Sequence, residues 1–144
     1  EQNKNRMPFR HGATQEAAMG IPARIHSKLW LEHNGEMLLG VGRTELLRRI
    51  GELGSLKKAA ESLGMSYRAA WGRLKRTEAA MGISLVEDTG VRREGYRLTP
   101  EGQHIVDAFL HWQEDVRRYA VARAAELPFL ELMGAEEQTP EDRT

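Results

Sequence analysis

The chain has 144 residues, and its 21 lysine and arginine side chains balance 21 aspartate and glutamate side chains, so the formal net charge is zero. It contains no cysteine, which excludes disulfide bonds and thiolate metal sites. Its length fits a single domain, and it has neither an apolar run that spans a bilayer nor a hydrophobic signal core, so we expect a soluble, cytoplasmic protein.

The N-terminal part begins with a segment that lacks any hydrophobic period. Residues 1–22 mix Gln, Asn, Arg, Gly and Pro, and we expect a flexible arm there. A strand signal follows from Ile25 to Val41, where Asn34 and Gly35 separate two apolar runs. This dipeptide suits a two-residue type I′ turn, because both of its residues tolerate positive φ. The pattern predicts a β-hairpin that packs beside helices, since an isolated two-stranded ribbon is only marginally stable.

An amphipathic helix is predicted next. Gly42 is expected to end the hairpin, and the helix is expected to run from Thr44 to Leu53. Arg48 and Arg49 fall near its end, where cations complement the helix dipole. We expect this helix to support the two helices that follow it. Its apolar face consists of Leu46, Leu47, Ile50 and Leu53.

Residues 54–78 have the pattern of two short helices joined by a tight turn. Ser55 stands at an N-cap position, where its hydroxyl can accept a first-turn amide proton. Gly64 is expected to end the first helix, because glycine enters the left-handed conformation without steric cost, and Ser66 is expected to cap the second. This arrangement predicts a helix-turn-helix, whose second helix can enter the major groove of DNA. The inward residues are Leu56, Ala59, Ala60 and Leu63 in the first helix and Ala70, Leu74, Thr77 and Met81 in the second.

The outer face of this helix pair is basic. Residues 56–76 contain six lysine and arginine side chains against the single acid Glu61. Trp71 also lies off the apolar side, and a tryptophan on a wet, basic face suggests a partner. Both features favour DNA binding over the alternative of an ordinary helix pair with solvated charges. The DNA-binding candidates are Ser55, Lys57, Lys58, Ser66, Tyr67, Arg68, Trp71, Arg73, Lys75 and Arg76.

A second hairpin is predicted over residues 85–98. Two short apolar runs flank a turn that is rich in glycine, arginine and acidic residues. The turn carries Arg92 and Arg93, which a wing would bring close to the DNA phosphates beside a docked helix. A plain solvated hairpin is the alternative, and the preceding helix pair favours the wing.

A long helix is predicted to begin at Thr99 and Pro100, which have the residue types expected at an N-cap and at the first helical position. Apolar residues then recur at alternating steps of four and three, the spacing of a heptad seam that packs against a partner helix. We therefore expect this helix to pack against a partner helix. Leu127 and Pro128 end or kink the helix, and residues 126–144 form a short apolar patch and an acidic tail. The dimerisation candidates are Ile105, Phe109, Trp112, Val116 and Tyr119.

Charge is unevenly distributed along the chain. Residues 42–98 hold twelve basic side chains against seven acidic ones, whereas residues 99–144 hold four against ten. This asymmetry indicates a basic working surface with an acidic segment held away from it.

The order of these predicted parts resembles a known family. The resemblance rests on the strings KLWLEHNGEMLLGVGRTELLRRI, GSLKKAAESLGMSYRAAW and RLTPEG, which are similar to the DNA-binding domain of the molybdate-responsive ModE regulators and, through it, to the winged helix of LysR-type regulators. It covers roughly residues 25–120, and it implies that the long helix forms a two-fold dimer. ModE regulators continue into molybdate-binding domains, whereas this chain stops soon after its long helix, so we expect no molybdate or tungstate binding within it. The residues that the resemblance places against DNA are Ser66, Tyr67, Arg68, Trp71 and Lys75.

We therefore expect a mainly α fold with small β elements, a winged helix-turn-helix over residues 23–125 with an N-terminal β-hairpin and a long C-terminal dimerisation helix. The predicted function is that of a homodimeric, sequence-specific transcriptional regulator of double-stranded DNA, with a recognition helix at about residues 67–80 and no cofactor. The alternative is a winged-helix module that binds a protein partner through the Trp71 face. An enzyme is not expected, since the chain lacks a phosphate-binding glycine loop and a metalloprotease motif. No metal site is predicted either, because two helical turns separate His104 and His111, which flank Asp107 on one face of the long helix.

Overall fold

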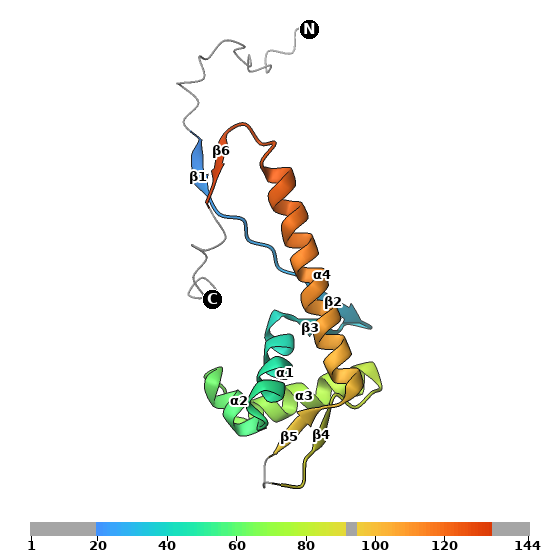
Figure 1. Ribbon diagram of the computed structural model, residues 1–144. Coiled ribbons are helices and arrows are strands. Elements are labelled where there is room, and N and C mark those ends of the chain that lie inside the picture. The colour runs from blue at the N-terminus through green and yellow to red at the C-terminus, as the bar shows by residue number, and fades with distance from the viewer. Residues whose placement is uncertain (1–19, 92–94, 134–144) are drawn as a thin grey trace, which may run out of the picture. The chain divides into compact units, whose positions relative to one another are not determined.

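The computed structural model of the protein describes residues 20–91 and 95–133 (Figure 1). The chain forms two compact units, Ser27–Arg117 in one and residues 20–26 with 118–133 in the other. The predicted mainly α fold with small β elements is confirmed. No helix among the described residues combines the length and apolar character that crossing a membrane requires. In chain order the elements are β1 (Ile21–Ala23), β2 (Trp30–His33), β3 (Glu36–Gly40), α1 (Val41–Leu53), α2 (Leu56–Ser62), α3 (Tyr67–Met81), β4 (Val86–Asp88), β5 (Tyr96–Leu98), α4 (Pro100–Ala124) and β6 (Leu130–Leu132).

Helices α1, α2 and α3 surround the core of the Ser27–Arg117 unit (Figure 1). Ile50, Leu56 and Ala70 come from the three helices in turn, and all three are fully buried. Burying one large aliphatic side chain is worth about 1.5–3 kcal/mol, so these inward faces hold the helices together. The inward faces predicted for the helix pair are confirmed, with Leu56, Ala59, Ala60, Ala70, Leu74 and Thr77 buried and Leu63 and Met81 half-buried.

The β2–β3 hairpin has the predicted turn. Asn34 and Gly35 take φ values of 51° and 79°, the two positive values that a type I′ turn needs. Leu39 of β3 is buried, and this strand packs on α1 and α3. The predicted strand region began too early, because residues 25–29 are not in a strand and β2 begins at Trp30.

Helix α1 begins and ends differently from the prediction. It starts at Val41, directly after β3, so Gly42 lies in its first turn and does not end the hairpin. Leu53 is 41% exposed and does not belong to the buried face. It is the last residue of the helix, and the chain turns away at Gly54, which has a φ of 64°.

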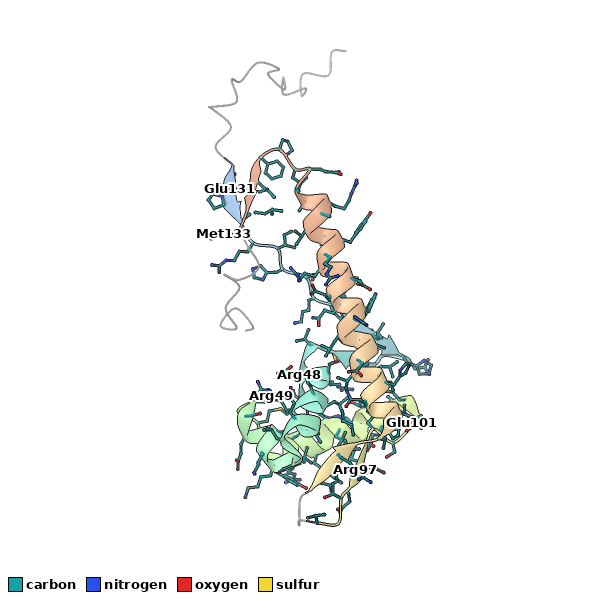
Figure 2. The ribbon with its side chains drawn as sticks, in the orientation of Figure 1. Arg48, Arg49, Arg97, Glu101, Glu131 and Met133 are labelled. Atoms are coloured by element: carbon teal, nitrogen blue, oxygen red, sulfur yellow. The ribbon has the colours of Figure 1, made fainter. Side chains whose placement is uncertain are left out.

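Arg48 and Arg49 do not act at the end of α1 as predicted, because the last turn contains no basic residue. Both guanidinium groups bind the carboxylate of Glu45, at 2.6 Å from Arg48 and 3.0 Å from Arg49, and Arg48 also pairs with Glu52. The hydrogen bonds from the two arginines lower the pKa of Glu45 against the opposing effect of burial. Figure 2 shows both arginines on α1. Their charges are therefore neutralised within the helix.

The predicted second hairpin is the antiparallel pair β4–β5. Its register places Val86 opposite Leu98. The amide N–H of Tyr96 donates to the carbonyl of Gly54 at 3.2 Å, so β5 also runs beside the connection between α1 and α2. This backbone bond attaches the wing to the helix-turn-helix.

Helix α4 begins as predicted, with Pro100 as its first residue. The hydroxyl of Thr99 accepts the N–H of Gly102 at 3.0 Å and donates to the carbonyl of Ser84 at 2.7 Å. Gly102 is buried, and a Cβ at this position would overlap the carbonyl of Leu85. The first turn of α4 therefore packs directly on the backbone at the start of the wing.

The predicted seam of α4 divides into an inner and an outer part. Phe109 is only 4% exposed and lies in the monomer core, with its ring edge-on to Trp112 at 5.7 Å between centroids. Ile105 packs partly against the same core. Farther along the helix, Trp112 and Tyr119 are 39% and 69% exposed. Assigning Phe109 to an exposed seam was wrong, because heptad spacing also fits the side of α4 that covers its own core.

The second unit contains a parallel pair of short strands, β1 and β6. The N–H of Ile21 donates to the carbonyl of Phe129 at 2.8 Å, and Figure 2 labels Glu131 in β6 and Met133 directly after it. Treating residues 1–22 as a flexible arm was therefore wrong at its end, where Ile21 begins a strand. Residues 1–19 lie outside the described residues. The apolar patch predicted after Pro128 supplies the partner strand.

Replacing Gly102 by alanine is expected to lower the free energy of unfolding by about 2–3 kcal/mol, because the new Cβ would force α4 away from the Leu85 backbone. Thermal denaturation followed by circular dichroism measures the loss. Gly72→Ala in α3 is the matched control, since nothing lies within 4 Å of a Cβ at that position. This control should gain roughly 0.5–1 kcal/mol from helix propensity. A Gly102→Ala variant as stable as the control would contradict the close packing.

Candidate nucleic-acid interface

Two serine caps and one glycine set the path of the chain around α2 and α3. The hydroxyl oxygen of Ser55 accepts the N–H of Lys58 at 3.2 Å, and that of Ser66 accepts the N–H of Ala69 at 3.1 Å. Gly64 has a φ of 65°, the left-handed value expected just after a helix end. The three local predictions are confirmed. Because both hydroxyl oxygens serve as caps, Ser55 and Ser66 position the helices.

The outward face of α3 lies opposite its buried residues. Since Ala70 and Leu74 point into the core, the helical period directs the other side of α3 away from it. Gly72 lies in the middle of that side, with open space where its Cβ would be. A glycine inside a helix costs about 0.5–1 kcal/mol relative to alanine, and no neighbouring atom among the described residues requires it here. The outward face consists of Arg68, Gly72, Lys75 and Arg76, with the exposed Tyr67 at the start of the helix.

Trp71 is half-buried, which corrects the prediction of a tryptophan off the apolar side of α3. Its ring packs against the core and lies 6.0 Å from the ring of Tyr96 in the wing. The ammonium of Lys75 lies 4.5 Å from the centroid of the indole ring, a cation–π contact. Trp71 sits between the inward and outward faces, and the ring of Tyr96 from β5 lies beside it. This contact disfavours the alternative in which Trp71 anchors a protein partner.

Glu78 ties α3 to the start of the wing. Its carboxylate accepts the N–H of Leu85 at 2.7 Å and the hydroxyl of Ser84 at 3.2 Å, and it pairs with Lys75 at 3.1 Å. Burial raises the pKa of Glu78, but the Leu85 amide, Lys75 and Ser84 together lower it below its ordinary value. Glu78 was not identified from the sequence, because a lone acid on a basic helix resembles a solvated charge.

The other basic candidates lie on different sides of the helix pair. Lys57 and Lys58 are exposed on α2. Arg73 is also exposed, but it lies on the flank of α3 that faces the β2–β3 hairpin, where it lines a cleft with Arg43. Arg43, in the first turn of α1, was not identified from the sequence, which gives no signal for its position. The structure therefore separates Arg73 from the outward face.

The described part of the wing contributes one further cation. Arg97 of β5 is exposed and pairs with Glu87 of β4 at 2.7 Å (Figure 2). Arg92 and Arg93, the predicted phosphate contacts of the wing, lie outside the described residues.

The acid and histidine side chains of α4 do not converge. His104, Asp107 and His111 are exposed, and Asp107 accepts a hydrogen bond from Gln103 at 2.9 Å. Across residues 20–91 and 95–133, no group of three His, Asp or Glu side chains is arranged to hold a metal ion. What the candidate surface offers is positive charge and hydrogen-bond donors.

Residues 42–103 match the family model described as bacterial regulatory helix-turn-helix protein, lysR family. This range runs from the first turn of α1 through the wing to the first turn of α4. Over this range the chain is similar to the LysR-type helix-turn-helix domain. The finer resemblance to ModE regulators stays a prediction.

Individual proteins are similar over the same region. The chain is 33% identical over 92 residues to the molybdenum-pterin-binding protein MopB of Rhodobacter capsulatus, an alignment that covers 62% of this chain and only 34% of that protein. The solved complex of the CbnR DBD with DNA is 25% identical, with a TM-score of 0.47, and the match covers 58% of this chain and 94% of that one. The BenM DBD with catB site 1 DNA is 21% identical, with a TM-score of 0.48 and coverages of 61% and 97%.

Replacing Glu78 by glutamine is expected to lower the free energy of unfolding by about 1 kcal/mol at pH 7, because the charge-assisted bonds to the wing are weakened. The pKa of Glu78 is depressed in the fold, so its charge stabilises the protein above the unfolded-state pKa. That contribution is lost as the pH falls through the folded-state pKa. Urea denaturation should show a smaller difference in stability between the two proteins at pH 3 than at pH 7.

The control for this series is Glu61→Gln on α2, whose side chain is exposed. It should change stability little at either pH. A loss for Glu78→Gln that is the same at pH 7 and pH 3 would contradict a role for the charge of the carboxylate.

Proposed function

We propose that this chain, with its LysR-type helix-turn-helix domain, is a sequence-specific, DNA-binding transcription regulator that acts as a homodimer. The observation that carries the proposal is the outward face of α3, where Arg68, Lys75 and Arg76 surround Gly72. The inward side of the same helix is fixed in the core, so these cations stand on a rigid support. An α-helix with its side chains is about 10–12 Å wide, and the major groove is about 12 Å wide, so the helix fits the groove.

Individual roles follow from position on the helices. Arg68 lies in the first turn of α3, the part of a recognition helix that contacts base edges, and arginine donates two parallel hydrogen bonds to guanine. Lys57 and Lys58 on α2 and Arg76 on α3 are assigned to phosphates, which accept charge-assisted bonds from any DNA sequence. The missing side chain at Gly72 leaves room for the DNA to approach the helix backbone closely.

Lys75 is held in place before any DNA arrives. Its ammonium lies over the ring of Trp71 and pairs with Glu78. A lysine that is already ordered loses less side-chain entropy on binding than a free one. We therefore assign Trp71 a positioning role beneath Lys75.

The wing is proposed to contact the DNA backbone beside the recognition helix. Strands β4 and β5 attach to α3 through Glu78 and through the ring contact between Trp71 and Tyr96. This attachment keeps the wing on one flank of α3. Arg92 and Arg93 are assigned to phosphates on the basis of the sequence.

The dimer is proposed to form through the outer part of α4. Trp112 and Tyr119 are large and exposed, and Val116 between them is half-buried. Burying each such side chain against a second copy is worth roughly 1.5–3 kcal/mol. Phe109 is excluded from this interface, because it is buried in the monomer core, against which Ile105 also packs in part.

Molybdate, tungstate and cofactors are outside this proposal. What the name of MopB says that it binds belongs to that protein, of which the alignment covers about a third. In this chain, residues 99–144 hold ten acidic side chains against four basic ones, a balance that repels a dianion.

The proposed function is tested by selecting sequences from random duplex DNA and then titrating the enriched and random duplexes. Arg68→Ala is expected to lower discrimination between the two duplexes, by about 1–3 kcal/mol for a lost bidentate base contact. Lys57→Ala should weaken binding to both duplexes by the same factor, because a phosphate contact carries no sequence information. Failure to enrich any sequence would overturn sequence-specific binding. Equal losses on both duplexes for Arg68→Ala would remove that residue from the base contacts.

Replacing Val116 by glutamate is expected to dissociate the dimer, because it places an unpaired carboxylate in the proposed apolar interface. Sedimentation at micromolar concentration should show more monomer than for the wild type. His111→Glu is the matched control, since His111 is exposed on another side of α4 and should leave the dimer intact. An unchanged dimer for Val116→Glu would place the interface elsewhere, with the hairpin around Trp30 as the next candidate.

A further inference from the structure

A basic cleft lies in the Ser27–Arg117 unit between the β2–β3 hairpin, the start of α1 and one flank of α3. Its volume is about 350 Å³. Lys28, Arg43 and Arg73 line it, together with the side chains of Trp30 and Met37. None of the described acidic side chains belongs to its lining. We call it the hairpin cleft.

The cations of the hairpin cleft are crowded. A guanidinium nitrogen of Arg43 donates to the carbonyl of Met37 and, at 3.1 Å, to the hydroxyl of Thr77, so this arginine is anchored. Burial lowers the pKa of Arg43, and so do the like charges of Arg76 and Arg73, while Glu36 raises it. Since like charges close together repel, an anion that enters the cleft relieves this repulsion.

Arg73 and Lys28 remain available for such an anion. Both side chains are exposed, and neither has a hydrogen-bond or ion-pair partner among the residues that the structure describes. The guanidinium of Arg73 lies close to the backbone of α1, with one nitrogen 4.0 Å from the position of a Cβ on Gly42. The two cations therefore stand at the rim of the cleft without an internal role.

The position of the cleft relates it to the recognition helix. The wing contacts one flank of α3 through Trp71 and Glu78, and the hairpin cleft adjoins the opposite flank at Arg73. A helix lying in the major groove has one phosphate strand along each of its sides, because the groove is about as wide as the helix. Each flank of α3 thus carries a β-hairpin where a DNA strand would pass.

We propose that the hairpin cleft binds a phosphate of the DNA backbone and its deoxyribose, so that the β2–β3 hairpin acts as a second clamp opposite the wing. This inference rests on the proposed DNA-binding function. Lys28 and Arg73 contact the phosphate oxygens. Arg43, which is anchored by Met37 and Thr77, adds a positive charge at a fixed position in the cleft. The exposed side chains of Trp30 and Met37 pack against the sugar. An isolated oxyanion would make no apolar contact with Trp30 and Met37, whereas a DNA backbone offers both a phosphate for the cations and a sugar for these two side chains.

The experiment uses the 144-residue chain and tests whether one DNA phosphate interacts with one side chain of the hairpin cleft. Phosphates of the enriched duplex are replaced one at a time by uncharged methylphosphonate, and affinities are measured by fluorescence anisotropy. For the wild type, one phosphate in each half-site outside the wing contact should cost roughly three- to tenfold in affinity. In Arg73→Ala the same replacement should cost nothing further, since the contact is already gone. Arg73→Lys keeps the charge and should behave nearly as the wild type.

Salt dependence supplies a second, independent readout. Arg73→Ala and Lys28→Ala should each reduce the slope of log K against log salt by about one per contacted phosphate, with equal losses on enriched and random duplexes. Arg123→Ala is the control, because this exposed cation is paired with Glu126 and lies outside the cleft. Circular dichroism confirms that each variant is folded.

Every outcome has a defined meaning. A wild type that binds no DNA would defeat the proposed function itself. Salt-dependent DNA binding that is unaffected by Arg73→Ala and Lys28→Ala would overturn only the clamp. The clamp would also be overturned if the affinity loss caused by Arg73→Ala simply added to the loss caused by the methylphosphonate at every position. Titration with inorganic phosphate, followed by amide shifts at Gly42 and Arg43, tests the other source of the anion. Saturation at micromolar phosphate without any change in salt slope would make the cleft a small-anion site and overturn the clamp.

Discussion

The peptide groups of Leu85 join helix α3, the wing and helix α4, and the geometry of the candidate interface depends on this junction. The amide of Leu85 donates to Glu78 of α3 at 2.7 Å, and its carbonyl accepts the N–H of Thr99 at 2.9 Å. Gly102 of α4 packs against the same carbonyl, where no Cβ fits. Since the Leu85 side chain is also fully buried, moving the wing away from α3 would leave buried backbone groups unpaired. The wing therefore keeps its place beside α3.

Cations in this chain divide into those with an internal partner and those without. Arg48 and Arg49 bind Glu45, and Arg97 binds Glu87, so these charges are largely neutralised where they stand. Exposed ion pairs are worth only about 0–1 kcal/mol, so the fold loses little where a cation has no such partner. The proposed DNA partner, a polyanion, accounts for the clustering of those positions on α2, α3 and the hairpin cleft. Within the described residues, the cations without an ion-pair partner in these places are Lys28, Lys57, Lys58, Arg68, Arg73 and Arg76.

Features that depend on a few neighbouring residues were predictable. The positive φ values at Asn34 and Gly35, the cap at Ser66 and the start of α4 at Pro100 all follow from local conformational preferences. Predictions of the surroundings of a side chain were wrong where the helical period identified the apolar and polar sides of a helix but not which other segment packs against each side. Trp71 was expected to face solvent and instead packs under Lys75 and against the wing.

By itself, the sequence determined which segments become helices and hairpins, where most of them begin, and that the basic charge concentrates on the helix pair. Only the tertiary structure decided that Phe109 is inside the core while Trp112 and Tyr119 remain exposed on the same helix. It also decided that Arg73 faces the hairpin cleft and that β1 pairs with β6. The physical reason is range. Caps, turns and helical periods act through the backbone within a few residues, whereas burial and strand pairing depend on segments that are far apart in the chain and meet only in the fold.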